Sequence, residues 1–254
     1  MLLVADVGNT NIALGIYQET KLVAHWLLET RRERTADEYA LWCKLLLEAE
    51  HIQAKELHGA IIASVVPPLT PVIEQALSKV LGKAPMIIGP GIKTGMPILY
   101  ENPREVGADR IVNSVAAYDR FKQATIIVDL GTAIIFDAIS SKGEYLGGAI
   151  APGVQISMEA LFLRASKLPR VEIQAPAKVI GRTTITSMQS GILYGYAGMI
   201  DGLVERMTHE MNTRCEIIAT GHLASLLAST SKTIKHVDEL LTLEGLRLIY
   251  EKNK

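Results

Sequence analysis

The chain opens with the stretch Leu2-Leu3-Val4-Ala5-Asp6-Val7-Gly8-Asn9-Thr10-Asn11-Ile12-Ala13-Leu14-Gly15-Ile16-Tyr17, and a close echo returns in mid-sequence as Thr125-Ile126-Ile127-Val128-Asp129-Leu130-Gly131-Thr132-Ala133-Ile134-Ile135-Phe136-Asp137. Both copies read apolar strand, Asp-x-Gly-[Asn/Thr], apolar strand, which is typical of a β-hairpin with a tight connection. The connection exposes a carboxylate, and its glycine leaves the backbone N–H groups open to an anion. One copy alone favours an ordinary turn. Two copies in equivalent places predict two loops that hold a phosphate between them.

The composition indicates a folded protein with a small-molecule partner. The chain has 254 residues, of which 48% are hydrophobic and 21% charged, enough for a substantial apolar core. Its formal net charge is −1, and no run of lysine or arginine is longer than Arg31-Arg32. Nucleic acid and anionic membrane surfaces are therefore poor candidates for the main partner.

Two features bear on the cellular compartment. The N-terminus lacks a basic segment and Asp6 interrupts its leading apolar run, so we expect neither a signal peptide nor a transmembrane helix. Cys43 and Cys215 are the only cysteines and form no Cys-x-x-Cys pair, which argues against a disulfide framework or a structural zinc site. We expect a cytoplasmic protein with both thiols reduced.

Strand and helix patterns alternate through the first half of the chain. The capping box Thr35-Ala36-Asp37-Glu38 predicts the start of an amphipathic helix. The other expected elements are a strand from Lys21 to Leu28, a strand from His58 to Val66, a helix from Pro71 to Leu81 that stops at Gly82, and a short strand from Pro85 to Ile88. This alternation predicts a sheet with parallel elements.

A further helix carries a carboxylate at its border. Asn102-Pro103 is typical of a helix N-cap followed by proline at the first helical position. The buried stripe expected for this helix consists of Ala108, Ile111, Val112, Val115 and Ala116. Asp109 lies roughly 90° from the middle of that stripe on a helical wheel. A carboxylate at this position would lie at the border between the buried face of the helix and solvent.

The second half begins near Ala124 with the repeated hairpin. After it we expect a strand from Glu144 to Ile150, a helix from about Val154 to Arg164, a surface loop or flap from Ser166 to Arg182, a helix from about Thr184 to Met211, strands from Cys215 to Thr220 and from Thr233 to His236, and a helix from Val237 to about Glu251. The repeat predicts two similar halves, residues 1–122 and 123–254, each with its own phosphate hairpin.

Four glycines lie on one face of the long helix expected near residues 184–211: Gly191, Gly195, Gly198 and Gly202. Each glycine inside a helix costs about 1 kcal/mol relative to alanine. The stripe therefore indicates close approach of another backbone, either within the chain or across a dimer.

The absent motifs narrow the chemistry. The chain has no G-x-x-x-x-G-K-[ST], G-x-G-x-x-G, H-E-x-x-H or G-x-S-x-G sequence. Phosphoryl transfer needs metal-bound phosphates, an in-line nucleophile and a group that takes the nucleophile's proton. Carboxylates that face a phosphate loop are the residues to seek, and the candidates are Asp6, Asp109, Asp129 and Asp137. Asp137 lies at the end of a strand, so a structural or solvent-facing role is as plausible for it as a role facing the phosphates.

Two halves with Asp-x-Gly-[Asn/Thr] hairpins resemble the duplicated ribonuclease-H-like fold of acetate and sugar kinases, Hsp70 and actin: α/β domains with mixed sheets flanked by helices and ATP in the interdomain cleft. The likeness becomes specific in further segments, and from end to end the chain is similar to type III pantothenate kinases. These segments are Asn102-Pro103-Arg104-Glu105-Val106-Gly107-Ala108-Asp109-Arg110, Asp129-Leu130-Gly131-Thr132-Ala133, Gly147-Gly148-Ala149-Ile150-Ala151-Pro152-Gly153 and Thr184-Ile185-Thr186-Ser187-Met188-Gln189-Ser190-Gly191.

The resemblance implies a cytoplasmic homodimer that transfers phosphate from ATP to the primary hydroxyl of pantothenate, giving 4'-phosphopantothenate in the first step of coenzyme A biosynthesis. It also implies a divalent metal such as Mg²⁺ and a monovalent cation, K⁺ or NH₄⁺. By matching position, Asp109 would take the hydroxyl proton and Asp129 would hold the monovalent cation. ATP would be contacted by Asp6, Val7, Gly8, Asn9, Thr10, Asn11, Ile12, Ala13 and Thr132, and pantothenate by Tyr100, Gly107, Ala108, Asp109, Arg110 and Thr184.

The residues themselves support these roles unevenly. Asp6, Asp109 and Asp129 are also singled out by the hairpin and helix patterns. Tyr100 alone would be interpreted as a loop aromatic, and Thr184 alone as a helix N-cap.

The chain departs from the family pattern at two places. Ile134 and Ile135 stand where the family usually has threonines, and His222 stands where it usually has a second glycine. A sugar or acetate kinase of the same superfamily is the nearest alternative, although such chains are usually longer and would lack the Gly-Ala-Asp-Arg segment. A non-catalytic nucleotide-binding regulator or scaffold is the alternative from another class.

The His222 position yields a testable prediction. The turn after the strand that ends at Thr220 is expected near the adenosine, and an imidazole there either stacks on the base, worth about 1–3 kcal/mol, or occupies its space. We expect occlusion, so that His222→Gly lowers the KM for ATP and leaves the KM for pantothenate unchanged in steady-state assays. A raised KM for ATP would indicate stacking instead, and unchanged constants would indicate a solvent-facing side chain.

Overall fold

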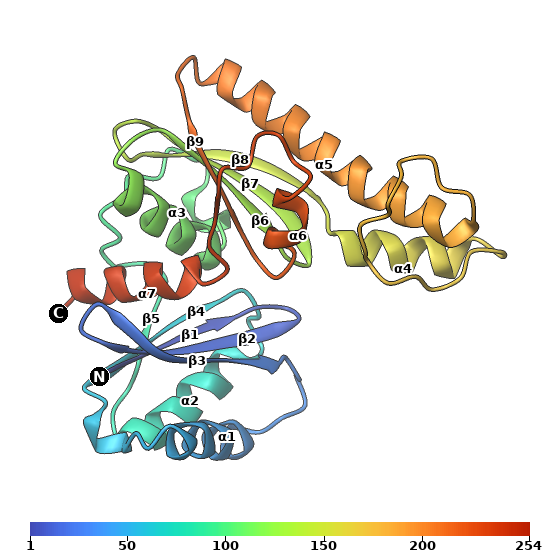
Figure 1. Cartoon of the computed structure of the whole chain (residues 1–254). Helices are drawn as coiled ribbons and strands as arrows, with labels where there is room; N and C mark the ends of the chain where they lie inside the picture. Colours follow the sequence, from blue (N-terminus) through green and yellow to red (C-terminus); the bar gives the residue numbers. More distant parts are fainter. The chain divides into compact units, whose positions relative to one another are not determined.

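The computed structural model describes residues 1–254 as two compact units (Figure 1). The first unit contains residues 1–96, 101–116 and 241–254, and the second contains residues 97–100 and 117–240. Each unit is built on one five-stranded sheet.

The first sheet has the strand order β3-β2-β1-β4-β5. Strand β1 (Leu2–Val7) pairs antiparallel with β2 (Asn11–Gln18), which pairs antiparallel with β3 (Lys21–Glu29). Strand β4 (Gly59–Ser64) runs parallel to β1, and β5 (Met86–Ile87) runs parallel to β4. This arrangement confirms the predicted hairpin and the predicted mixed sheet.

The second sheet repeats this arrangement. Strands β6 (Thr125–Leu130), β7 (Ala133–Ile139) and β8 (Tyr145–Pro152) form the antiparallel part. Strand β9 (Glu216–Thr220) runs parallel to β6, and β10 (His236–Val237) runs parallel to β9. Read from β8 to β10, the strand order is that of the first sheet, so the duplication predicted from the two hairpins is confirmed.

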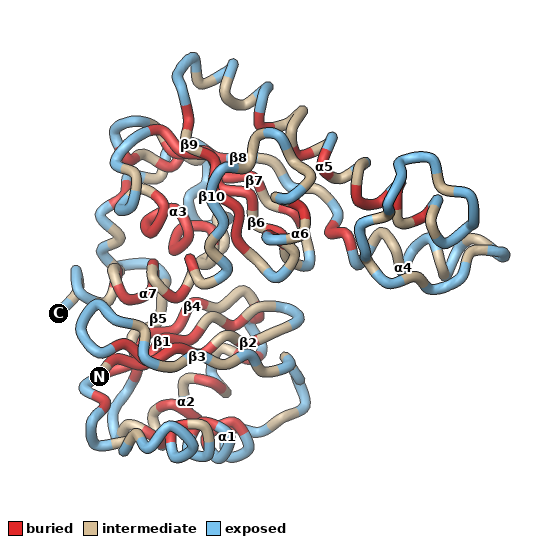
Figure 2. Tube along the Cα trace, viewed as in Figure 1, coloured by how far each residue is buried: buried red, intermediate tan, exposed pale blue.

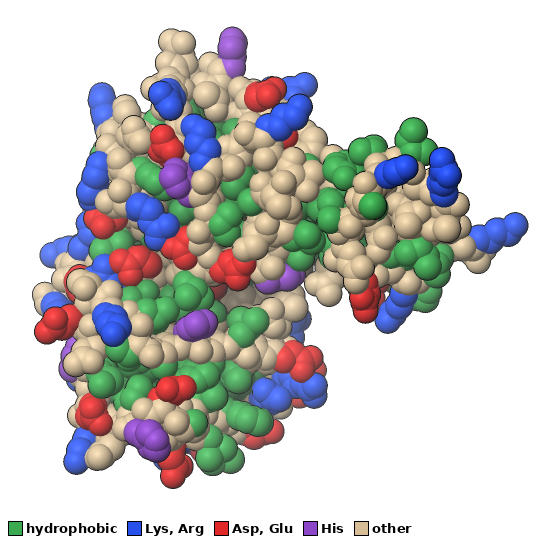
Figure 3. All heavy atoms as spheres, viewed as in Figure 1, with side chains coloured by type: hydrophobic (Ala, Val, Ile, Leu, Met, Phe, Trp, Pro, Cys, Tyr) green, Lys and Arg blue, Asp and Glu red, His purple; other side chains and the backbone are tan.

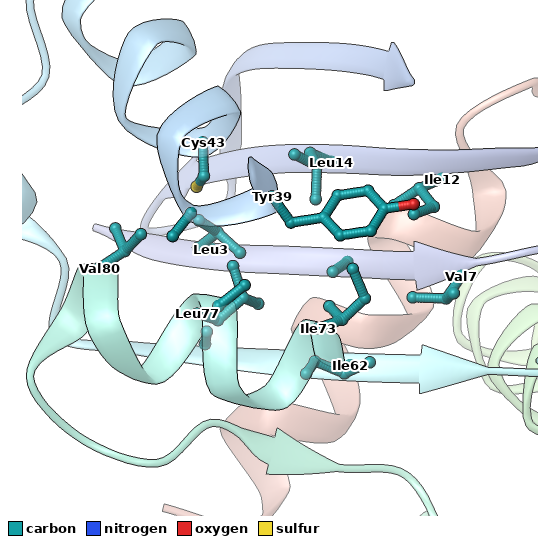
Figure 4. Close-up of a cluster of buried hydrophobic side chains, with 14 of the residues drawn as sticks. Leu3, Val7, Ile12, Leu14, Tyr39, Cys43, Ile62, Ile73, Leu77 and Val80 are labelled. Carbon is teal, nitrogen blue, oxygen red and sulfur yellow. The ribbon is translucent and has the colours of Figure 1, made fainter. Parts of the chain in front are cut away.

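Helices α1 (Ala36–Ala49) and α2 (Thr70–Leu81) cover one face of the first sheet (Figure 1). Thr35 and Glu38 form the predicted capping box of α1, and α2 ends at Gly82 in the left-handed conformation. Buried apolar side chains fill the space between these helices and the sheet (Figure 4) and include Leu3, Val7, Ile12, Leu14, Tyr39, Cys43, Ile62, Ile73, Leu77 and Val80. A short 3-10 turn, Ala54–Glu56, precedes β4.

Helix α7 (Leu241–Lys252) covers the opposite face of the same sheet (Figure 1). Leu241, Leu243, Leu246 and Ile249 are buried there. A Cβ atom on Gly15 would lie 3.0 Å from both Leu243 and Val4, which places those two side chains together. The boundary drawn from the repeat therefore differs from the compact units, because the last helix, expected in the second half, packs on the first sheet. Both faces of that sheet are apolar and need cover.

Helix α3 (Ala108–Phe121) starts later than the sequence suggests. Asn102 does act as a cap, but of the short 3-10 helix Pro103–Glu105, and Val106 is extended before the α-helix begins. Asp109 consequently lies in the first turn of α3, where backbone N–H groups have no partners within the helix.

The helices of the second unit are α4 (Val154–Arg164), α5 (Thr184–Glu210) and α6 (Ala224–Ala228). Burial is highest along the central strands of both sheets (Figure 2). The core of the second unit includes Val128, Leu130, Ile134, Phe136, Leu193, Ile200, Val204, Ile217 and Leu227. Residues 166–182 contain no helix or strand, as predicted. No helix in the chain has the length and apolar character to cross a bilayer.

Candidate active site

The first loop predicted to hold a phosphate is the turn between β1 and β2. Its ends are closed by a hydrogen bond of 3.0 Å from the Gly8 N–H to the Asn11 carbonyl. Thr30 supports the turn, because its hydroxyl donates to the Gly8 carbonyl at 2.7 Å and its N–H donates to the Thr10 carbonyl at 2.9 Å. Asn9 and Thr10 are exposed, and Asp6 is partly buried at the end of β1. The loop is therefore rigid at its base and open at its tip.

The segment Gly107 to Arg110 belongs to the same edge of the first sheet. The Val65 N–H, just after β4, donates to the Val7 carbonyl at 3.0 Å, so the ends of β4 and β1 lie together. A Cβ atom on Gly107 would lie 3.5 Å from Val65 and 2.4 Å from the Asp109 carboxylate. Position 107 therefore admits only glycine while the Asp109 side chain stays where it is. The structure brings Asp109 to the strand ends that carry the Asp6 loop.

The environment of Asp109 raises its basicity. Burial raises the pKa of the Asp109 carboxyl above its usual range, although a hydrogen bond of 2.8 Å from the Arg110 N–H partly opposes the shift. A carboxylate with a raised pKa accepts a proton more readily, which suits a general base. Arg110 itself is buried within the first unit.

The second phosphate loop lies between β6 and β7 and is surrounded by backbone. A Cβ atom on Gly153 would lie 2.1 Å from the Thr132 carbonyl oxygen, so that glycine is in direct contact with the loop. Gly221, with φ +90°, follows β9 and would place a Cβ atom 3.0 Å from the Asp129 carboxylate. Asp129 is partly buried and Thr132 is exposed. The predicted turn after Thr220 thus adjoins the loop, because β9 runs parallel to β6.

The departures from the family pattern have different structural meanings. Ile134 is fully buried in the core of the second unit, so this side chain does not face a phosphate. Ile135 is partly buried, and His222 is exposed directly after Gly221. Of the three, His222 is the side chain most open to solvent.

Tyr100 and Thr184 both occur in the second unit, in different settings. Tyr100 is partly buried, and a Cβ atom on Gly147 would lie 3.4 Å from its ring. Thr184 is exposed and lines an open pocket of about 840 Å³ together with Leu161, Leu168, Gly181, Thr183 and Met188. The interpretation of Thr184 as the N-cap is wrong, since Thr183 caps α5 in a capping box with Thr186.

Asp137 is not part of either phosphate loop. Its side chain is 1% exposed, and it accepts a hydrogen bond of 2.7 Å from the hydroxyl of Tyr145, which is itself fully buried. The sequence left open whether Asp137 faces the phosphates or has a structural or solvent-facing role, and its burial supports the structural role. Sequence reasoning missed Tyr145 and Val65, because neither carries a pattern that distinguishes it from an ordinary core residue.

Metal-binding side chains are sparse. The chain contains no group of three or more His, Cys, Asp or Glu side chains placed to hold an ion. Mg²⁺ in kinases is typically held by one or two carboxylates, substrate phosphates and water. Asp6 and Asp129 each lie at one of the two loops and are partly buried.

Comparison with solved structures confirms the fold. The chain is similar to an inorganic polyphosphate/ATP-glucomannokinase from Arthrobacter sp. strain KM, with a TM-score of 0.51 and 16% identity over 99% of this chain and 97% of that one. It is also similar to component A of (R)-2-hydroxyglutaryl-CoA dehydratase from Acidaminococcus fermentans, with a TM-score of 0.56 and 12% identity over 100% and 99%. These likenesses concern the fold, which is the duplicated ribonuclease-H-like architecture.

Comparison of sequences identifies the family. The family model of type III pantothenate kinase matches residues 2–206. The type III pantothenate kinase of Geobacter sulfurreducens is 56% identical over 100% of both chains, and that of Myxococcus xanthus is 55% identical over 100% of this chain and 99% of that one. The chain therefore belongs to the type III pantothenate kinase family, which catalyses the ATP-dependent phosphorylation of pantothenate in coenzyme A biosynthesis.

Proposed function

We propose that Asp109 is the general base that takes the proton of the pantothenate primary hydroxyl. The carrying observation is a partly buried carboxylate with a raised pKa, located at the strand ends that bear the Asp6 loop. Loss of the proton turns the hydroxyl into a stronger nucleophile for the terminal phosphate of ATP. The direct test is pantothenate-dependent release of ADP in the presence of Mg²⁺ and K⁺. No ADP release would favour the non-catalytic nucleotide-binding alternative, and ADP release independent of pantothenate would indicate ATP hydrolysis by water instead.

The two loops are proposed to bind ATP. Residues Asp6 to Ala13 present the backbone of a tight turn with exposed Asn9 and Thr10, and Thr132 presents a hydroxyl from the second loop. Backbone N–H groups of such turns suit phosphate oxygens. Mg²⁺ would supply charge neutralisation of the phosphates, and Asp6, at the end of β1, would hold it through oxygen or water.

The pantothenate site is proposed from three segments. Gly107, Ala108, Asp109 and Arg110 lie at the start of α3, Tyr100 precedes this helix in the chain, and Thr184 begins α5. Asp129 is proposed to hold a monovalent cation, K⁺ or NH₄⁺, because Gly131 and Gly221 leave space beside its carboxylate. A cytoplasmic location is proposed as well, supported by two free, buried cysteines.

A homodimer is proposed from the glycine stripe of α5. A Cβ atom on Gly191, Gly195 or Gly198 would meet nothing within 4 Å, and one on Gly202 would meet only Arg206 of the same helix. No backbone of this chain approaches the stripe, so of the two partners expected from the sequence a second copy is favoured. Apolar side chains also gather on the surface around α4 (Figure 3), where Ile156, Leu161 and Leu163 are exposed.

The base assignment predicts a specific loss of turnover. Asp109→Asn should keep the fold and ATP binding but lower kcat by about 10²- to 10⁴-fold, the usual range for a lost general base. The control is Asp119→Asn, which changes an exposed carboxylate of the same helix that pairs with Lys122. Near-wild-type kcat in Asp109→Asn would exclude this role.

The same variant should change stability with pH in a defined direction. Since burial raises the pKa of Asp109 in the folded state, the folded protein binds this proton more tightly than the unfolded chain. The contribution of the Asp109 carboxyl to the free energy of unfolding is therefore greatest at low pH, where it is protonated. That contribution is lost as the pH rises through the raised pKa. Asp109→Asn should melt at a higher temperature than the wild type at pH 8, and the difference should shrink at acidic pH. A lower melting temperature at pH 8 would contradict the burial effect.

The cation assignment predicts salt-specific kinetics. Activity should require K⁺ or NH₄⁺, because an oxygen site beside phosphates needs charge compensation that one divalent ion does not complete. Assays at constant ionic strength with KCl, NH₄Cl or NaCl check this, and Asp129→Asn should abolish the difference between the salts. Full activity with sodium alone would argue against the site.

The dimer proposal predicts that a large side chain on the glycine stripe of α5 disrupts the dimer. Gly198→Leu should shift the protein from dimer to monomer in sedimentation, whereas Lys44→Ala, at an exposed position of α1, should leave the dimer intact. If the stripe faced solvent, Gly198→Ala would instead stabilise a monomer by about 1 kcal/mol. A monomeric wild-type protein would refute the proposal.

A further inference from the structure

Two buried polar side chains, Asp137 of β7 and Tyr145 of β8, are hydrogen-bonded to each other next to Tyr100. Tyr145 is 0% exposed, its hydroxyl donates to the Asp137 carboxylate at 2.7 Å, and Asp137 is 1% exposed. Hydrogen bonds to charged acceptors are short and strong when buried. The Tyr145 side chain is therefore held by the hydrogen bond at its hydroxyl as well as by the packing of its ring.

The backbone of Tyr145 holds the segment that leads to Tyr100. The Tyr145 N–H donates to the Pro97 carbonyl at 2.9 Å, and the Leu99 N–H donates to the Tyr145 carbonyl at 2.8 Å. Ile98 forms a parallel bridge with the same residue. Residues 97–99 are thus held against β8 by an isolated β-bridge at Tyr145 and its two hydrogen bonds.

A bulge beside Tyr145 makes room for the Tyr100 ring. Ile139 pairs with Tyr145 and Ala138 pairs with Gly147, so Leu146 is the extra residue of β8. Gly147 takes φ +124°, and a Cβ atom there would lie 3.4 Å from the Tyr100 ring. The rings of Tyr100 and Tyr145 have centroids 6.3 Å apart and planes at 52°. Bulges commonly redirect a side chain next to an active site.

We propose that Tyr145, anchored by Asp137, is a positioning residue that fixes the place of Tyr100 and so sets the affinity for pantothenate. The argument uses contacts within the second unit and rests on the proposed contact of Tyr100 with pantothenate. Neither Asp137 nor Tyr145 touches substrate in this scheme, because both are enclosed in the core. Their effect is transmitted through the Pro97–Leu99 segment.

The first test is Tyr145→Phe, which keeps the ring and removes the hydrogen bond to Asp137. The KM for pantothenate should rise by about fivefold or more, since small displacements of a binding group have large kinetic effects, while the KM for ATP stays unchanged. Thr125→Val is the matched control, because it also removes a buried hydroxyl from the second sheet, one that bonds the Gln123 carbonyl. Equal pantothenate KM values in Tyr145→Phe and Thr125→Val would overturn the proposal.

A second comparison separates this proposal from the role of Tyr100. Tyr100→Ala should raise the KM for pantothenate, and adding Tyr145→Phe to it should cause no further rise. An unchanged KM in Tyr100→Ala refutes the role of Tyr100 itself, whereas a raised KM there with no effect of Tyr145→Phe refutes only the positioning role.

Hydrogen exchange in the unliganded protein provides a readout that does not depend on pantothenate. The Leu99 amide should exchange faster in Tyr145→Phe than in the wild type or in Thr125→Val. Unchanged exchange at Leu99 would overturn the inference, whatever the kinetics of Tyr100 variants.

Discussion

A tight glycine turn at the end of a buried strand is the constraint on which both units depend. The strands β1 and β6 are almost wholly buried, so their ends are held in place by the cores, whereas Asn9 and Thr132 reach solvent. Hydrogen bonds hold the base of the turn between β1 and β2, such as the one that the Thr30 hydroxyl donates to the Gly8 carbonyl. A rigid base with an open tip is what an electrostatic phosphate cradle requires.

Asp109, Asp129 and Asp137 differ in their surroundings, and the differences support the separate roles proposed for them. Asp109 is desolvated and its pKa is raised, which suits proton transfer. Asp129 stands beside glycine backbone, which leaves room for an ion next to it. Asp137 is enclosed and hydrogen-bonded by Tyr145, so it serves the architecture. Burial and neighbouring groups thus give the three aspartates three different environments.

Glycines other than those of the two hairpins also shape the site. Gly107 leaves space for the Asp109 carboxylate, Gly153 touches the second loop through the Thr132 carbonyl, and Gly147 makes room for Tyr100. At each position a Cβ atom would lie within 3.5 Å of a residue proposed to belong to the site. The glycine-rich segment Gly147 to Gly153 therefore supports two separate features, the second phosphate loop and the Tyr100 ring.

The sequence by itself determined the repeated hairpin, the mixed sheets and most helices, because these depend on local periodicity and turn chemistry. The roles of Asp6, Asp109 and Asp129 remain predictions from the same patterns. It did not determine that α7 packs on the first sheet, that α3 begins at Ala108, or that Ile134 belongs to the core. Those outcomes depend on which apolar faces meet, and the Asp137–Tyr145 pair depends on a bulge that shifts register. Only the tertiary structure decides them, since the contacts join residues whose local patterns do not distinguish one partner from another.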